Sequence, residues 1–84
     1  MLDINMNTSI NSQFLVFSKV KDTGKTEGWD VLSKRSNAIL GYISWYAPWR
    51  QYCFSPSART VFNAACLKDI SSCIKGLMDE RRGK

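Results

Sequence analysis

The sequence predicts an α+β fold: an antiparallel β-meander of about four strands with one C-terminal α-helix packed on one face of the sheet. Two observations predict it. Strand-forming runs separated by short turn segments fill residues 13–56, and helical periodicity is confined to the C-terminal stretch. The 84 residues suffice for one small domain. We assign residues 1–12 to a flexible N-terminal arm, with at most a short strand at residues 2–6, and residues 13–84 to a single α+β domain.

The first two predicted strands flank a turn at residues 21–25. Strand-forming side chains run from Phe14 to Val20 and define the first strand. Gly24 provides the turn chemistry that follows it. Apolar and polar residues then alternate over residues 29–34, which predicts the second strand.

The third predicted strand covers residues 39–46 and ends before Pro48, which cannot donate a hydrogen bond to a sheet ladder. The fourth, residues 50–55, returns antiparallel to it, since short connections join neighbouring strands as hairpins. Alternation of side chains places one apolar set on a shared face: Ile43, Trp45, Tyr52 and Phe54.

The last predicted element is a helix over residues 64–81. Asn63 is a favoured N-cap residue, and Phe62 and Leu67 have the spacing of a hydrophobic staple around that cap. Apolar residues at helical spacing predict one stripe that covers the sheet. Its expected members are Leu67, Ile70, Ile74, Leu77 and Met78, with Cys66 and Cys73 at its edges.

The chain carries a formal net charge of +5, from 12 Lys and Arg against 7 Asp and Glu. Such a balance favours anionic partners: nucleic acid, a nucleotide or an acidic protein face. The positive residues are scattered, apart from Arg81, Arg82 and Lys84, and we interpret this basic tail as solvated. Solubility alone is the alternative explanation of the charge.

The sequence argues against catalysis. It contains no His and only three Cys, none in a Cys-x-x-Cys pair. General acid–base catalysis and activation of a thiol both need a positioned base. Gly24-Lys25-Thr26 matches the end of a phosphate-binding loop, but Lys19 occupies the position of the required first Gly. We therefore expect no enzyme, no metal and no cofactor, and we interpret the cysteines as small buried hydrophobes in a reducing compartment.

The run from Trp45 to Tyr52 is the densest aromatic segment, with four of the ten aromatic residues beside a proline and an arginine. Trp, Tyr and Arg dominate binding hot spots, and they can stack on nucleobases or pair with phosphate. We therefore expect a ligand-binding face here. Its predicted residues are Tyr42, Tyr46, Trp49, Arg50 and Arg59.

The alternative is a structural role for this aromatic cluster. Trp45 and Trp49 flank the Pro48 turn, so one can serve the core while the other serves the surface, and the sequence leaves that choice open. An arginine of the cluster can equally form a surface ion pair. The residues that we expect in the core are Trp45, Tyr52 and Phe54.

Residues 40–56 read Leu-Gly-Tyr-Ile-Ser-Trp-Tyr-Ala-Pro-Trp-Arg-Gln-Tyr-Cys-Phe-Ser-Pro, and are followed by Thr60-Val61-Phe62 and Cys66-Leu67-Lys68-Asp69-Ile70. This half of the chain resembles a group of small, mostly uncharacterised proteins encoded by bacteriophages and integrated mobile elements. Their shared pattern is L-G-x-I-x-W-Y-x-x-W-R-x-Y-x-F-x-P, then T-V-F and a C-L-x-x-I helix. Where Lys is common in that group this chain has Ser44, which removes one positive charge from the face.

The resemblance implies a phage-type accessory protein that acts by binding. We predict a non-enzymatic protein that recognises a nucleic acid or nucleotide through its aromatic and arginine-bearing sheet face. The alternative is a protein–protein inhibitor of a bacterial anti-phage defence enzyme. So small a domain can also gain stability as a homodimer, through the open face or an edge strand.

The expected location is the host bacterial cytoplasm. The N-terminus lacks the basic start and apolar run of a signal peptide. No stretch of the sequence approaches the roughly 20 apolar residues of a membrane span. We therefore expect no membrane partner.

Overall fold

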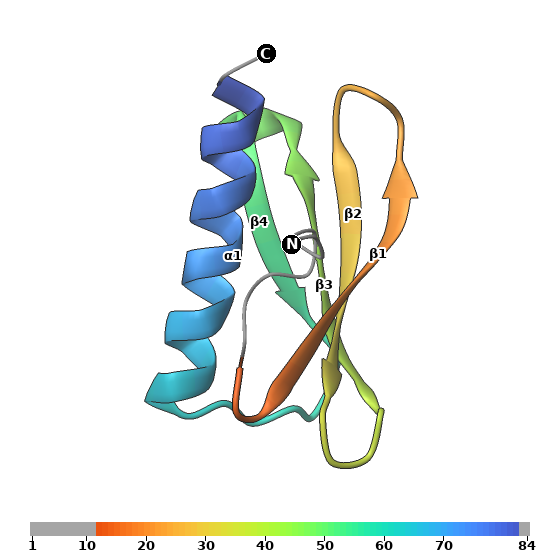
Figure 1. The fold of residues 1–84 in the computed structure, drawn as a ribbon, viewed down its shortest axis with the longest axis vertical. Coiled ribbons are helices and arrows are strands. Elements are labelled where there is room, and N and C mark those ends of the chain that lie inside the picture. The colour runs from red at the N-terminus through yellow and green to blue at the C-terminus, as the bar shows by residue number, and fades with distance from the viewer. Residues whose placement is uncertain (1–11, 83–84) are drawn as a thin grey trace, which may run out of the picture.

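The protein is a twisted, four-stranded antiparallel sheet with one helix along one of its faces (Figure 1). The computed structural model describes residues 12–82. Strands follow one another in the sheet in chain order. The elements are β1 Leu15–Asp22, β2 Glu27–Ser33, β3 Ile39–Tyr46, the 3-10 helix η2 Ala47–Trp49, β4 Gln51–Pro56 and α1 Ala64–Arg82. The predicted meander with a C-terminal helix is confirmed.

Two turns of the meander depend on left-handed backbone positions. Gly24, between β1 and β2, has a φ of +88°, and its N–H donates to Asp22 Oδ1 at 2.9 Å. Asn37, between β2 and β3, has a φ of 63°, and its N–H donates to the Ser33 carbonyl at 2.7 Å. Gly and Asn are the residues that adopt this conformation most readily, so the sequence itself fixes where the strands reverse.

Of the predicted arm, residues 1–12, only Ser12 lies within the described residues. The short strand expected at residues 2–6 lies outside them. Ser12 is buried. Its Oγ accepts hydrogen bonds from the backbone N–H groups of Phe14 at 3.2 Å and Leu15 at 3.0 Å. These bonds set the approach of the chain to β1.

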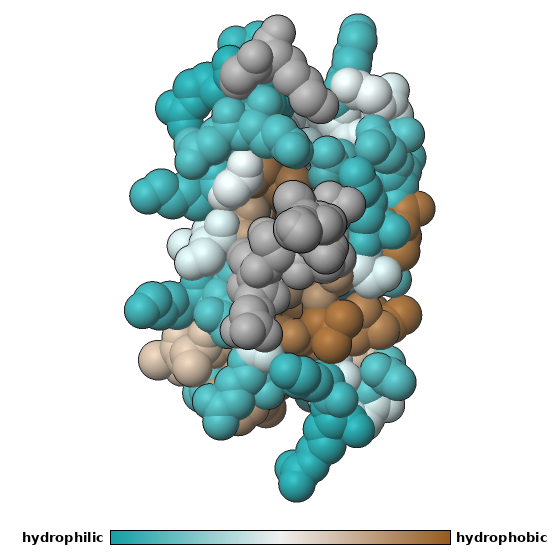
Figure 2. Space-filling view, viewed as in Figure 1, coloured by the Kyte–Doolittle hydropathy of each residue, from teal (hydrophilic) through white to brown (hydrophobic). Residues whose placement is uncertain are grey.

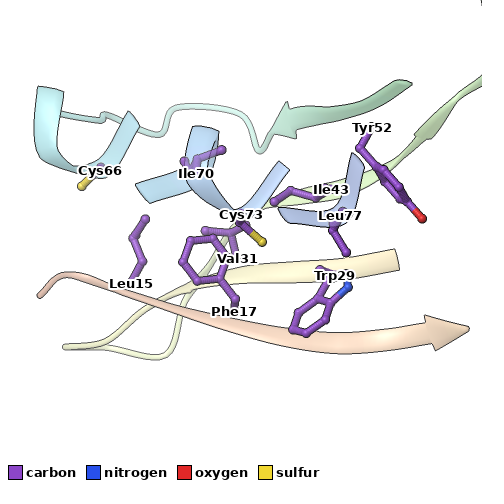
Figure 3. Packing of buried hydrophobic residues seen from close by; sticks show 10 residues of the cluster. All are labelled: Leu15, Phe17, Trp29, Val31, Ile43, Tyr52, Cys66, Ile70, Cys73 and Leu77. Carbon is purple, nitrogen blue, oxygen red and sulfur yellow. The ribbon is translucent and has the colours of Figure 1, made fainter. Parts of the chain in front are cut away.

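The core lies between the helix and one face of the sheet. Figure 3 shows side chains of α1 pointing toward those of the strands. Val31 and Ile43 are fully enclosed at its centre, and Val31 opposes Phe17 on one neighbouring strand and Gly41 on the other. The buried apolar residues are Leu15, Phe17, Trp29, Val31, Ile43, Tyr52, Cys66, Ile70, Cys73 and Leu77. Trp45 and Phe54 are half-buried and pack against this set.

The buried stripe of α1 runs through the two cysteines that the sequence analysis placed at its edges. Its buried members are Cys66, Ile70, Cys73 and Leu77. Leu67 is 51% exposed, so its assignment to the stripe was wrong. The reason is that the buried residues follow the i, i+4, i+7, i+11 line along one helix face, and a thiol packs there as a small hydrophobe. The predicted N-cap is confirmed, because Asn63 Oδ1 accepts a hydrogen bond from the Cys66 N–H at 2.8 Å.

The two edges of the sheet differ in how they are protected. On the β4 side, the backbone N–H of Tyr52 donates to Met78 Sδ at 3.4 Å, so the helix covers part of that edge. On the other side, β1 is interrupted by a bulge between Lys19 and Lys21. Bulges and lysines are typical devices against edge-to-edge pairing. A second copy of the chain is therefore discouraged from pairing along β1.

The face of the sheet away from the helix is mixed in character. Tyr42 opposes Asp30 and Ser55 there, and Val16 opposes Leu32. Figure 2 is seen from the side on which α1 and β1 are both in view; hydrophobic side chains gather there mainly along β1, and hydrophilic ones cover most of the rest of that side. Within residues 12–82, no helix combines the length and the apolar character that crossing a membrane requires.

Candidate ligand-binding site

The aromatic segment singled out in the sequence forms the tight turn between β3 and β4. Pro48 stands in the first turn of the short helix Ala47–Trp49, where its missing N–H costs no hydrogen bond. Arg50 ends this helix in the left-handed conformation, with φ 55° and ψ 45°. Its N–H donates to the Ala47 carbonyl at 3.1 Å. The turn therefore has a defined backbone on which side chains can be positioned.

Tyr46 and Trp49 form an exposed aromatic pair on this turn. Their ring centroids are 5.2 Å apart and their planes are at 88°, which is a favourable edge-to-face arrangement. Tyr46 is 45% exposed and Trp49 is 66% exposed. Arg50 follows and is also exposed. We call Tyr46, Trp49 and Arg50 the aromatic tip; it presents ring surface and one guanidinium to the solvent.

The other two predicted site residues lie apart from the aromatic tip. Tyr42 is half-buried in the middle of β3, with its hydroxyl over Gly28, where there is no room for a Cβ. Arg59 is exposed in the connection from β4 to α1, at the opposite end of the sheet from the β3–β4 turn (Figure 1). The 6 residues of β4 separate these ends by about 20 Å. The structure thus brings three of the five predicted residues together, and Arg59 is not among them.

A further cation, which the sequence analysis missed, lies at the same end as the aromatic tip. The guanidinium carbon of Arg81, in the last turn of α1, lies over the Trp45 ring at 4.0 Å from its centroid. Arg81 Nη1 also donates to the Lys25 carbonyl at 2.9 Å, which ties the helix end to the β1–β2 turn. Trp45 is fixed by an edge-to-face contact with Tyr52 at 5.4 Å. A depression of about 300 Å³ opens here, which we call the Arg81 depression; it is lined by Trp45, Met78, Arg81 and Arg82.

A periodicity signal could have found Arg81. From the sequence alone, Arg81 belongs to a basic tail that is expected to be solvated. However, Arg81 stands four residues after the buried Leu77 and three after Met78, so it extends the covered face of α1 by one turn. A long arginine in that position packs its stem on apolar surface and keeps its head group near water. Arg82 instead pairs with Asp79 Oδ1 at 2.8 Å on the exposed side.

Polar groups beneath this end of the molecule are engaged with one another. The Glu27 side chain is only 11% exposed, and its Oε1 accepts a hydrogen bond from Trp29 Nε1 at 2.9 Å. The Tyr52 hydroxyl accepts one from the Glu27 backbone N–H at 3.0 Å, and burial raises the pKa of that phenol. Lys19 reaches Asp22 at 3.2 Å and Glu27 at 4.0 Å, and its hydrogen bond to Asp22 raises its pKa. This network supports the core side chains rather than the exposed tip.

The three cysteines are free thiols, of which Cys66 and Cys73 are buried and Cys53 is half-buried. Burial raises the pKa of the Cys73 thiol to about 11. It therefore stays protonated and unreactive near neutral pH. Among residues 12–82, no three or more His, Cys, Asp or Glu side chains come together in a way that could hold a metal ion.

Fold and site together define a small α+β protein that carries an exposed aromatic pair and an exposed arginine on the turn between β3 and β4. The chain is 41% identical, over 73 residues, to the uncharacterized 9.3 kDa protein of Acholeplasma phage L2, and the match covers 86% of this chain and 94% of that relative. The chain therefore belongs to this family of small phage proteins. No protein-family model matches it, and no solved structure does either.

Proposed function

We propose that this protein is a non-enzymatic phage accessory protein that binds an anionic ligand, a nucleic acid or a nucleotide, at its aromatic tip in the host bacterial cytoplasm. The observation that carries the proposal is the 66% exposure of Trp49, held against Tyr46 and followed by Arg50. Indole and phenol rings stack on nucleobases, and a guanidinium pairs with phosphate. Covering a large apolar side chain stabilises a fold by about 1.5–3 kcal/mol, so a tryptophan left this open suggests a contact outside the fold.

The distribution of charge supports the end of the sheet, rather than its whole open face, as the binding surface. Around Tyr42, the open face offers short polar side chains and the carboxylate of Asp30. An acid at that position disfavours an anionic ligand. The cations at this end of the molecule include Arg50 of the tip and, in the last turn of α1, Arg81 and Arg82 (Figure 1).

Fluorescence anisotropy with labelled oligonucleotides and a labelled nucleotide tests this proposal. We expect the affinity of the wild-type protein to fall steeply as salt rises, because phosphate contacts release counterions. Trp49→Ala should weaken binding about tenfold or more through loss of stacking, and Arg50→Ala should lower the salt dependence. Arg59→Ala, at the far end of the sheet, is the matched control. The proposal fails if the wild type binds none of these probes, or if both tip variants bind like the wild type while remaining folded.

A protein partner is the second candidate, and the edge-to-face pair of Tyr46 and Trp49 beside an arginine favours it, because hot spots have this composition. The partner class would be a bacterial anti-phage defence enzyme, which the protein would inhibit. An aromatic protein interface weakens little as salt rises, so the salt series separates the two candidates. Under this alternative, the enzyme would be inhibited by the wild type and not by Trp49→Ala, and no oligonucleotide would compete.

A further inference from the structure

We propose that the Arg81 depression is a phosphate-binding subsite for single-stranded nucleic acid, with bases stacking on the aromatic tip while the backbone crosses Arg81. This inference rests on the proposed function and narrows its ligand to an unpaired strand. The guanidinium carbon of Arg81 lies 4.0 Å from the centroid of the Trp45 ring. At that separation the guanidinium is laid over the indole, which leaves its N–H donors available around its rim.

Arg81 has hydrogen-bond donors to spare. A guanidinium carries five N–H groups. Within residues 12–82, Arg81 makes one side-chain hydrogen bond, from Nη1 to the Lys25 carbonyl, and no ion pair. That carbonyl is a neutral acceptor at an exposed site, so a charged phosphate oxygen can replace it with a stronger bond. Because Trp45 and the Lys25 turn already hold the side chain, little conformational freedom remains to be lost on binding.

The charges around the depression add up in favour of an anion. Arg82 lines it too, and its pairing with Asp79 is between two exposed side chains, 74% and 59% accessible. Such a pair is weak in water, so Arg82 can turn toward a phosphate. Glu80 of the same turn and the partial negative charge at the carboxyl end of α1 oppose an anion. Two of the four residues that line the depression are nevertheless arginines, so its immediate lining is cationic.

The shape of this end favours a strand over an enclosed nucleotide. Pockets that hold small molecules cover most of the ligand's surface. The Arg81 depression, about 300 Å³ with four lining residues, is at the small end of such pockets, so it suits a phosphate group better than a whole nucleotide. Trp49 is open to solvent, and only an unpaired base can lie flat against such a ring. The carboxyl end of α1 and the β3–β4 turn lie at the same end of the molecule, so one strand can contact both (Figure 1).

The test is binding of a short fluorescein-labelled oligo-dT to the full chain at a series of salt concentrations. We expect Arg81→Gln to weaken binding about tenfold and to reduce the slope of log affinity against log salt by about one. Arg81→Lys keeps the charge but loses the planar fork, so it should retain the slope and recover only part of the affinity. Arg59→Gln, which removes an exposed arginine at the far end, should stay within about twofold of the wild type at low salt.

The outcomes separate this inference from the function on which it rests. If Trp49→Ala loses binding while Arg81→Gln keeps the wild-type affinity and slope, the subsite is wrong and the proposed function stands. If the wild type does not bind oligo-dT at all, both are wrong for nucleic acid strands. If thymidine monophosphate displaces the probe as well as unlabelled oligo-dT does, the ligand is a nucleotide and the commitment to a strand is overturned. Thermal melts accompany each variant; should Arg81→Gln unfold, a folded Arg81→Lys with unchanged affinity would likewise overturn the subsite.

Discussion

Trp29 and Trp49 are the same side chain in opposite surroundings. Trp29, in β2, is 3% exposed, and its Nε1 donates to Glu27 Oε1 at 2.9 Å. Trp49, in the β3–β4 turn, is 66% exposed, packs edge-to-face on Tyr46, and has no hydrogen-bond partner for its indole N–H in the part of the chain that the structure describes. Trp45 lies between these extremes: it is half-buried, contacts Tyr52 and carries Arg81 on its ring.

In a chain this small, the contrast between Trp29 and Trp49 separates structural from functional aromatic residues. A tryptophan that stabilises the fold has both its ring covered and its N–H satisfied. Trp49 meets neither condition, so removing it should cost the fold little and any contact with a partner a great deal. Each of the variants and conditions below tests this contrast, in order of decreasing expected effect on stability.

Trp29→Ala should have the largest effect, with a loss of about 3–5 kcal/mol in the free energy of unfolding. It would leave a cavity in the core and leave the Glu27 carboxylate without its indole donor. Urea denaturation followed by circular dichroism measures the loss. Trp29→Phe, which refills most of the cavity, should recover part of the lost free energy of unfolding. A loss below about 1 kcal/mol in Trp29→Ala would mean that Trp29 does not stabilise the core.

Gly41→Ala should destabilise the protein by about 2–3 kcal/mol through overpacking. An added Cβ would lie 2.7 Å from the Ser55 carbonyl oxygen, which is backbone of the paired strand β4 and cannot move aside. Gly76→Ala is the matched control, because nothing lies within 4 Å of a Cβ at that helix position. We expect that control to be neutral or stabilising by about 1 kcal/mol, because alanine has the higher helix propensity.

The stability of the fold should fall in alkali, with Cys73 as the main cause. Its folded-state pKa of about 11 exceeds the pKa of 9.0 for a free thiol, so the unfolded chain loses this proton first. Ionisation of the Cys73 thiol therefore leaves stability unchanged below about pH 9 and lowers it between about pH 9 and pH 11. The expected loss is on the order of 1–2 kcal/mol after allowance for solvent screening. Urea denaturation at pH 8 and pH 10.5 measures the decline. Cys73→Ala should reduce it, whereas Cys53→Ala should not; an equal decline in both variants would assign it to other groups, such as the buried Tyr52 phenol, whose pKa is also raised.

Trp49→Ala should have the smallest effect on stability, within about 0.5 kcal/mol of the wild type, because the residue is a surface position without buried contacts. Val61→Ala, at a 90% exposed apolar residue outside the site, is the control for loss of exposed apolar surface. A destabilisation of Trp49→Ala above about 2 kcal/mol would mean that the aromatic pair holds the turn together and that its exposure is not a sign of a binding site.

The sequence was sufficient for the elements and for their order in the sheet, and insufficient for the rotation of the helix against it. Strand β3 has the bounds that were predicted, because alternation and Pro48 are local signals, and the start of α1 followed from Asn63 as N-cap. The rotation of the helix about its axis was not predictable from hydrophobicity alone. The helix face that carries Cys66 and Cys73 packs on the sheet, and Leu67 is exposed, because the fit to the sheet decides which side chains are enclosed.

The same distinction between local and long-range signals applies to the candidate site. The aromatic tip lies within one turn, so its residues were found from sequence spacing. The contact between Arg81 and Trp45 joins residues far apart in the chain and depends on where the helix ends against the sheet. Arg59 was grouped with Arg50 although a whole strand separates them, and counting the length of β4 would have excluded it.

The most direct measurement is a titration of the ¹⁵N-labelled protein with oligo-dT, followed at the indole N–H signals of its three tryptophans. Trp49 and Trp45 should shift as binding proceeds, and Trp29, enclosed in the core, should stay in place and serve as the internal reference. Saturable binding that moves Trp29, or that leaves both Trp45 and Trp49 unmoved, would contradict the assignment of this end of the molecule as the binding surface.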